Sequence, residues 1–186
     1  MKKILIGLTV LFATLVMSGC GAAKLAPEKQ ALITEKTVVY TQVAMWSDKE
    51  KVSGTNYSVT NLIPINSEAT ILSVSGSSIE FTVNGQQLTY LVISKYTKIT
   101  SAQMLDRLFS TKKVDLSTFS QDEQTNITNG IVANGMSKEA VLLARGYPPA
   151  HATASTEANT WKYWRNRWTT GIVTFKDNVV IRSSVR

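Results

Sequence analysis

The segment between residues 134 and 149 constrains this chain most, because it contains a complete set of helix start and stop signals. Ser137 provides an N-cap oxygen that can accept a hydrogen bond from an otherwise unpaired backbone N–H group. Gly146 provides the left-handed residue that commonly ends a helix, and Pro148 and Pro149 prevent any continuation. The sequence therefore predicts a short helix that begins after Ser137 and ends before Gly146.

Another helix and three strands are predicted around this segment. Ser120 and Glu123 have the spacing of a capping box, which predicts a helix that begins near Gln121. Strands are predicted at about residues 160–164, 171–175 and 179–183. This sheet is expected to cover the two helices with one face and to leave the other face in solvent.

Eight consecutive residues after position 160 contain three Trp, one Tyr and three cationic side chains. In a strand, successive side chains point to opposite faces. Trp161 and Tyr163 therefore share one face, and Lys162 and Trp164 share the other. One of these two pairs must belong to the core.

The turn after this strand is the predicted binding surface. It contains Arg165, Arg167 and Trp168, and Arg and Trp are residue types enriched at interface hot spots. We predict that these three residues, together with Lys162, bind a partner. The alternative is that cation–π stacking merely orders an exposed loop.

Residues 120–186 resemble a known family. The resemblance rests on a Gly-Met-Ser-Lys-Glu turn between two helices, a Gly-Tyr-Pro-Pro helix stop and a Trp-x-Tyr strand. These features are similar to the SmpA/OmlA/BamE family of small outer-membrane lipoprotein domains. The resemblance implies a two-helix, three-strand α+β unit, which in the best-known member is an accessory to the machine that inserts β-barrels into the outer membrane. This chain differs by carrying a whole extra region before the motif.

Residues 1–19 are predicted to be a lipoprotein signal peptide. Two lysines precede an apolar stretch at residues 4–16, which is shorter than the about 20 residues of a membrane-spanning helix. The sequence Met-Ser-Gly-Cys at residues 17–20 resembles the lipobox read by bacterial lipoprotein signal peptidase. We therefore predict that Cys20 is lipidated and anchors the chain to a membrane. The alternative is a free thiol at the end of an ordinary signal peptide.

Charge and composition indicate the surroundings of the mature chain. The formal net charge is +7, and it falls to +5 when the signal peptide leaves with its two lysines. A modestly basic protein suits anionic surfaces such as phospholipid head groups, lipopolysaccharide or peptidoglycan, and the envelope address excludes nucleic acid. Residues 20–36 are small and polar and are predicted to be a tether. The alternative is a first element of the fold that contains Leu32 and Ile33.

Residues 37–111 are predicted to form a β-rich domain. Extended segments are expected at residues 37–43, 57–59, 70–74, 79–83 and 88–92. Asn84-Gly85 is a strong hairpin signal, and the mixed charges at residues 47–51 predict a solvated loop. A helix at residues 101–110, capped by Ser101, closes the domain. This pattern predicts a small antiparallel sheet or SH3-like barrel.

Catalytic chemistry is not visible in the sequence. His151 is the only histidine, whereas a general base needs a nucleophile to activate and a metal site needs several ligands. We expect His151 to stack on Pro149 in a loop. The sequence therefore predicts no enzyme activity, no metal and no cofactor.

These observations predict an α+β protein in which an SH3-like barrel precedes a two-helix, three-strand domain at residues 120–186. The expected function is that of a non-catalytic lipoprotein, anchored in the outer membrane and facing the periplasm. It would act as a scaffold or accessory in outer-membrane protein assembly or envelope integrity, with envelope proteins as partners. The alternative is an inhibitor-like or peptidoglycan- or ligand-binding module.

Overall fold

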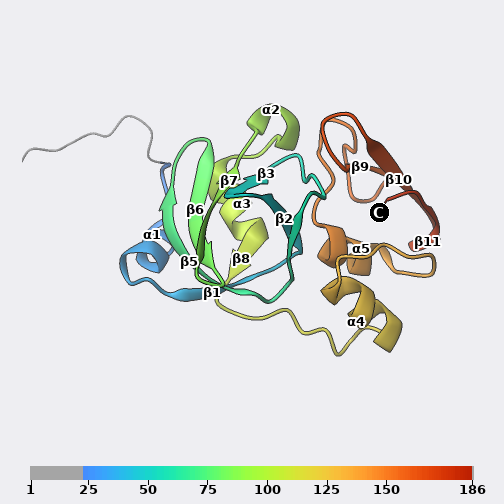
Figure 1. The fold of residues 1–186 in the computed structure, drawn as a ribbon, viewed down its shortest axis with the longest axis horizontal. Coiled ribbons are helices and arrows are strands. Elements are labelled where there is room, and N and C mark those ends of the chain that lie inside the picture. Colours follow the sequence, from blue (N-terminus) through green and yellow to red (C-terminus); the bar gives the residue numbers. More distant parts are fainter. Residues whose placement is uncertain (1–22, 186) are drawn as a thin grey trace, which may run out of the picture.

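The structure is a computed structural model that describes residues 23–185. The predicted signal peptide and the predicted lipidation site, Cys20, lie outside these residues. No helix in the described part of the chain is long and apolar enough to cross a membrane. Figure 1 shows a large curled sheet beside a smaller sheet with its own helices.

The larger sheet has eight strands in the order β4-β2-β3-β7-β6-β5-β1-β8. The strands are β1 (Val38–Thr41), β2 (Met45–Asp48), β3 (Lys51–Ser53), β4 (Asn61–Ile63), β5 (Glu68–Val74), β6 (Ser78–Val83), β7 (Gln86–Leu91) and β8 (Phe109–Ser110). Strands β3 and β7 run parallel, and the other neighbouring strands run antiparallel. The sheet is therefore mixed.

Helix α3 (Ser101–Leu108) lies inside the curl of this sheet (Figure 1). Its side chains Met104, Leu105 and Leu108 are buried in the same hydrophobic core as the inward-facing residues of the strands. The predicted helix is confirmed, but its N-cap is Thr100 rather than Ser101, and Thr100 forms a capping box with Gln103. The last two residues of the predicted helix form β8 instead.

The predicted meander is confirmed by β5, β6 and β7, which pair antiparallel in sequence order. Between β6 and β7, Asn84 and Gly85 have φ values of 51° and 77°. Two consecutive residues with positive φ match the tight turn that their sequence predicts. Local turn chemistry is therefore sufficient to specify this part of the sheet.

The predicted fold class is wrong. The molecule is mostly β, with one eight-stranded curled mixed sheet and five helices in its described part, instead of an SH3-like domain followed by a two-helix, three-strand domain. One reason is that residues 47–51, predicted as a loop, form most of a hairpin of β2 and β3. This hairpin pairs with β7 through a parallel contact, and β8 extends the sheet beyond β1. The predicted extended segment at residues 57–59 is a loop.

The two other helices near the large sheet are short. Helix α1 (Pro27–Thr34) occupies much of the predicted tether, with Leu32 and Ile33 packed against the core. The alternative interpretation of these residues, as a first element of the fold, is therefore correct. Helix α2 (Ser94–Thr97) follows β7.

The remaining helices are α4 (Gln121–Thr128) and α5 (Lys138–Arg145). The predicted capping box of Ser120 with Glu123 is present, and Ser137 caps α5 by accepting a hydrogen bond from the Ala140 N–H. Glu123 also accepts a hydrogen bond from the Ser137 N–H at 2.8 Å. One carboxylate therefore joins the starts of both helices.

Strands β9 (Thr160–Trp164), β10 (Thr170–Lys176) and β11 (Val179–Ser183) form an antiparallel sheet in the order β11-β10-β9. Trp161 and Tyr163 face inward, where they share a second hydrophobic core with Val141 of α5. Lys162 and Trp164 face outward and are half-buried. The inward pair of aromatic residues is therefore structural.

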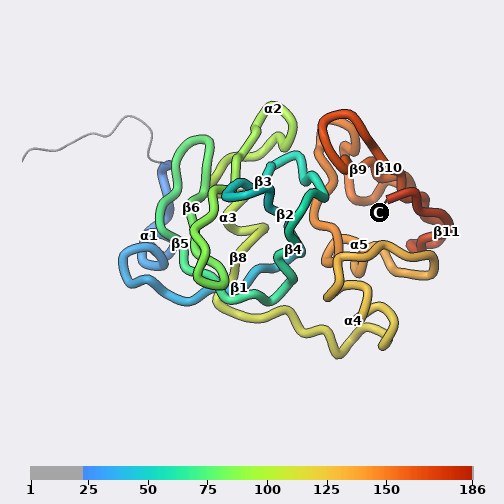
Figure 2. Tube along the Cα trace, in the orientation of Figure 1, coloured from blue at the N-terminus to red at the C-terminus, as the bar shows by residue number. Residues whose placement is uncertain are grey.

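The two cores meet where the segment leading into β2 passes α5. The Ala44 N–H donates a hydrogen bond to the Leu143 carbonyl oxygen at 2.9 Å. Figure 2 shows the connection from β8 to α4 running along one side of the molecule. Asn66 holds this connection through hydrogen bonds with both the N–H and the carbonyl oxygen of Val114, at 2.7 and 2.9 Å.

Candidate functional site

The most unusual residue at this junction is Arg145, the last residue of α5. It lies one helical turn after the core residue Val141, so it shares the buried stripe of the helix. Only 1% of its surface is exposed, which is rare for an arginine. Because of the helical repeat, the cationic side chain of Arg145 is buried between the two sheets.

Arg145 contacts both parts of the molecule. Its Nη1 donates to Asn56 Oδ1 at 3.1 Å, and its Nη2 donates to the Trp164 carbonyl oxygen at 3.0 Å. The guanidinium also stacks on the rings of Trp46 and Tyr163, with its carbon 4.4 and 5.1 Å from their centroids. The loop after β3 and strand β9 are thus joined through one side chain.

Among residues 23–185, no acidic side chain forms an ion pair with Arg145. The ion pair found in this part of the chain joins Lys29 and Asp106. The Nε of Arg145 also lacks a hydrogen-bond partner there. Burial lowers the pKa of Arg145 to about 10, with an opposing contribution from Tyr163, so the group remains a cation at neutral pH. A buried and incompletely hydrogen-bonded cation is unfavourable unless an anion accompanies it.

Arg145 lines a cavity of about 170 Å³ beneath the turn between β9 and β10. Arg165 contributes a second cation to the lining. Ser58, Thr169, Thr170 and Ser184 add hydroxyl side chains to the lining. We call this space the basic cavity.

A second hollow, of about 300 Å³, also has Trp164 in its lining. We call it the aromatic groove, and it is lined by Thr55, Tyr57, Tyr96, His151, Trp164, Arg167 and Trp168. Three rings follow one another along it, with centroid distances of 4.7 Å from Tyr96 to His151 and 5.0 Å from His151 to Trp164. His151 therefore stacks on two aromatic rings, Tyr96 and Trp164.

Cations surround the aromatic groove. Lys162 Nζ lies 5.2 Å from the Trp164 ring centroid, and Lys95 Nζ lies 5.5 Å from that of Tyr96. The Arg167 guanidinium lies 4.8 Å from the centroid of Trp168, whose exposed fraction is 81%. Asn166 orders the turn, because its Oδ1 accepts hydrogen bonds from the N–H groups of Trp168 and Thr169.

The four residues of the predicted binding surface therefore belong to two neighbouring sites. Arg167 and Trp168 line the aromatic groove, and Lys162 stacks on its Trp164. Arg165 instead lines the basic cavity, which Arg145 also lines. Sequence reasoning missed Arg145, although its spacing of four residues from Val141 placed it on the buried side of the helix.

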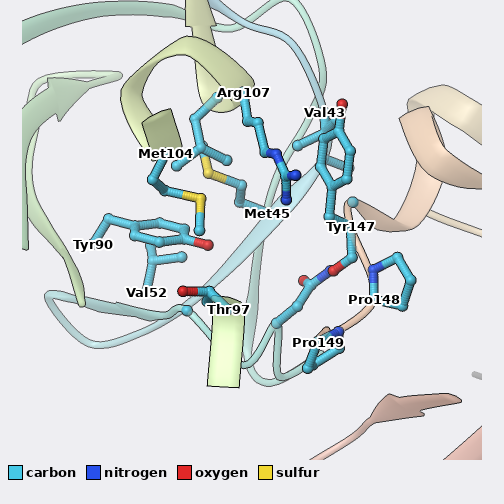
Figure 3. A pocket seen from close by; sticks show the side chains of 15 residues that line it. Val43, Met45, Val52, Tyr90, Thr97, Met104, Arg107, Tyr147, Pro148 and Pro149 are labelled. Carbon is cyan, nitrogen blue, oxygen red and sulfur yellow. The ribbon is translucent and has the colours of Figure 1, made fainter. Parts of the chain in front are cut away.

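An apolar pocket lies between the large sheet, α3 and the segment after α5 (Figure 3). Met45, Met104 and Tyr90 point into it, and Arg107 stacks on Tyr147 at its edge, 4.4 Å from the ring centroid. Its volume is about 30 Å³, enough for about two water molecules. Burial in this apolar space raises the pKa of Tyr90, with an opposing effect of Arg107. The pocket is part of the core and too small for a ligand.

The described residues contain no cluster of three or more His, Cys, Asp or Glu side chains that could bind a metal ion. No family model, curated protein or solved structure matches the chain. The resemblance of residues 120–186 to the SmpA/OmlA/BamE family therefore remains a prediction from the sequence.

Proposed function

We propose that this protein is a non-catalytic lipoprotein of the bacterial envelope, anchored through Cys20 in the outer membrane and facing the periplasm. It acts as a scaffold or accessory in outer-membrane protein assembly or envelope integrity. The lipobox-like sequence before Cys20 supports the anchor. The aromatic groove is the surface that binds the partner.

The observation that carries this proposal is the position of Trp168 at the edge of the groove. An indole exposed to 81% leaves a large apolar surface in water, and a Trp beside an Arg is the typical composition of a binding hot spot. Lys95, Lys162 and Arg167 surround the groove, and no acidic side chain lines it within the described part of the chain. The charge favours an acidic segment of an envelope protein as the partner.

A second candidate function is binding of peptidoglycan, supported by the row of rings from Tyr96 through His151 to Trp164. The electron-rich faces of aromatic rings attract the C–H groups on the apolar face of a sugar ring. A row of such rings offers a platform for successive sugars of a glycan strand.

The experiment compares the wild-type protein with Trp168→Ala as bait. The control is Val38→Ala, because Val38 is an exposed apolar residue of β1 outside the groove. Capture of envelope proteins from detergent-solubilised membranes should be lost with Trp168→Ala and retained with Val38→Ala. Sedimentation with purified sacculi, lost in the same variant, would favour the glycan. Capture of the same proteins by both variants would refute the groove as the contact surface.

The anchor is tested separately. Cys20→Ala should release the protein from the membrane fraction or leave it unprocessed, because lipidation requires the thiol. Intact mass and membrane fractionation measure both outcomes. An unchanged mass and an unchanged membrane fraction would refute lipidation at Cys20.

A further inference from the structure

We propose that the basic cavity is a binding site for an oxyanion, a carboxylate or phosphate group, held by Arg145 and Arg165. This site is distinct from the aromatic groove, with which it shares only Trp164 in the lining.

The first argument is the incomplete set of partners of Arg145. A guanidinium has five N–H donors, and the described residues accept hydrogen bonds from Nη1 and Nη2 but not from Nε. The group is almost completely buried and has no acidic neighbour in the described part of the chain. An anion in the adjoining cavity, which Arg145 lines, would neutralise this charge.

The second argument is the lining of the cavity. Arg165 adds a second cation, the side chains of Thr169 and Thr170 add hydroxyl groups, and no carboxylate lines the space within the described residues. Guanidinium and hydroxyl donors suit carboxylate and phosphate oxygens, and arginine binds both groups with parallel hydrogen bonds. Water alone would satisfy the donors but would leave the positive charge uncompensated.

The third argument is size. The cavity volume of about 170 Å³ is many times the roughly 10–15 Å³ that one water requires, so the space admits a carboxylate or phosphate group. It is far smaller than the about 300–1,000 Å³ of a typical drug-sized ligand pocket. The cavity therefore selects an acidic group rather than a whole cofactor.

The test measures binding of inorganic phosphate and of acetate to the mature protein by calorimetry at low ionic strength. Arg165→Gln should weaken the binding by roughly 10- to 100-fold, which corresponds to the loss of one hydrogen bond between charged groups. The control is Arg167→Gln, two positions away on the same turn. It should change the affinity by less than about twofold, because Arg167 lines the aromatic groove instead.

A second variant tests the buried cation directly. Arg145→Met removes the guanidinium and keeps a long apolar side chain, and anion binding should disappear. Circular dichroism establishes whether this variant folds. Should it not fold, the comparison of the exposed Arg165 and Arg167 variants remains decisive by itself.

The source of the acidic group is distinguished by further arms of the experiment. Preference for phosphate, together with Arg165-dependent retention on phosphatidylglycerol but not phosphatidylcholine vesicles, would assign a lipid head group. Binding of the small anions without such retention would assign a soluble acid. Absence of saturable binding of both anions at millimolar concentration would overturn the proposal, as would equal binding by wild type and Arg165→Gln.

Discussion

Asn56 offers the sharpest test of how the two cores are held together. Its side chain donates hydrogen bonds from Nδ2 to the carbonyl oxygens of Arg145 and Tyr147, and its Oδ1 accepts from Arg145 Nη1. Its backbone has a φ of 58°, a left-handed conformation that Asn tolerates and that Gly adopts without strain. Asn56→Gly therefore removes the side-chain contacts without straining the backbone.

The expected magnitude follows from these contacts. Two neutral hydrogen bonds contribute about 0.5–1.5 kcal/mol each, and the bond from the charged guanidinium contributes about 1.5–3 kcal/mol. Because neighbouring contacts are not additive, we expect a loss of about 3 kcal/mol in the free energy of unfolding for Asn56→Gly. Asn56→Ala should lose about 1–2 kcal/mol more, since its Cβ disfavours positive φ.

Urea unfolding measures this loss. With a slope of about 2 kcal/mol per M, the midpoint of Asn56→Gly should fall by about 1.5 M. Asn84→Gly is the matched control, because Asn84 also has a positive φ of 51° but lies exposed in the turn after β6. Its midpoint should change by less than about 0.5 M. Equal midpoints for the two Gly variants would refute the role of the Asn56 side chain, and a milder effect of Asn56→Ala than of Asn56→Gly would refute the backbone argument.

Three further predictions concern stability. Trp161→Ala should cost about 3–5 kcal/mol of unfolding free energy, measured by urea, because a core indole with 1% exposure leaves a cavity. Burial raises the pKa of Glu123, but hydrogen bonds from the two helix-capping serines outweigh it and lower the pKa overall. The stabilisation by Glu123 is therefore present above the unfolded-state pKa and is lost as the pH falls through the folded-state pKa, so Glu123→Gln should flatten the acid side of a stability–pH curve. The double variant Arg165→Ala/Arg167→Ala should change the free energy of unfolding by at most about 1 kcal/mol, because both side chains are exposed; early melting would make these arginines structural.

Local signals were sufficient to predict many elements. The Asn84-Gly85 turn, the Ser120 capping box and the Ser137 cap each act within four residues, and each is present in the structure. The mixed charges at residues 47–51 were misleading, because a hairpin can carry charges on its solvent-facing positions. What makes β3 part of the sheet is its parallel pairing with β7, a contact between distant residues that no local pattern encodes.

The candidate site also has a part that the local sequence indicates and a part that depends on contacts between distant residues. Composition alone drew attention to the turn after β9, since Arg and Trp are concentrated there. The partners of these residues come from other elements, with Tyr57 in the loop after β3, Tyr96 in α2 and His151 in the loop after α5. Their meeting depends on how the two sheets pack. The sequence therefore indicated one side of the groove and could not indicate the opposite side.

Arg145 connects the junction with the proposed anion site, and this connection leads to a final prediction. A ligand that binds the folded state stabilises it, so phosphate at about ten times its dissociation constant should add about 1.4 kcal/mol and raise the melting temperature by about 3–6 °C. Asn56→Gly should melt earlier but retain this rise, because it leaves the guanidinium intact with one more free donor. Arg145→Met should show no rise. Thermal melting with and without phosphate compares the wild type, Asn56→Gly and Arg145→Met. A phosphate-dependent rise in melting temperature that persists in Arg145→Met would place the anion elsewhere on the molecule.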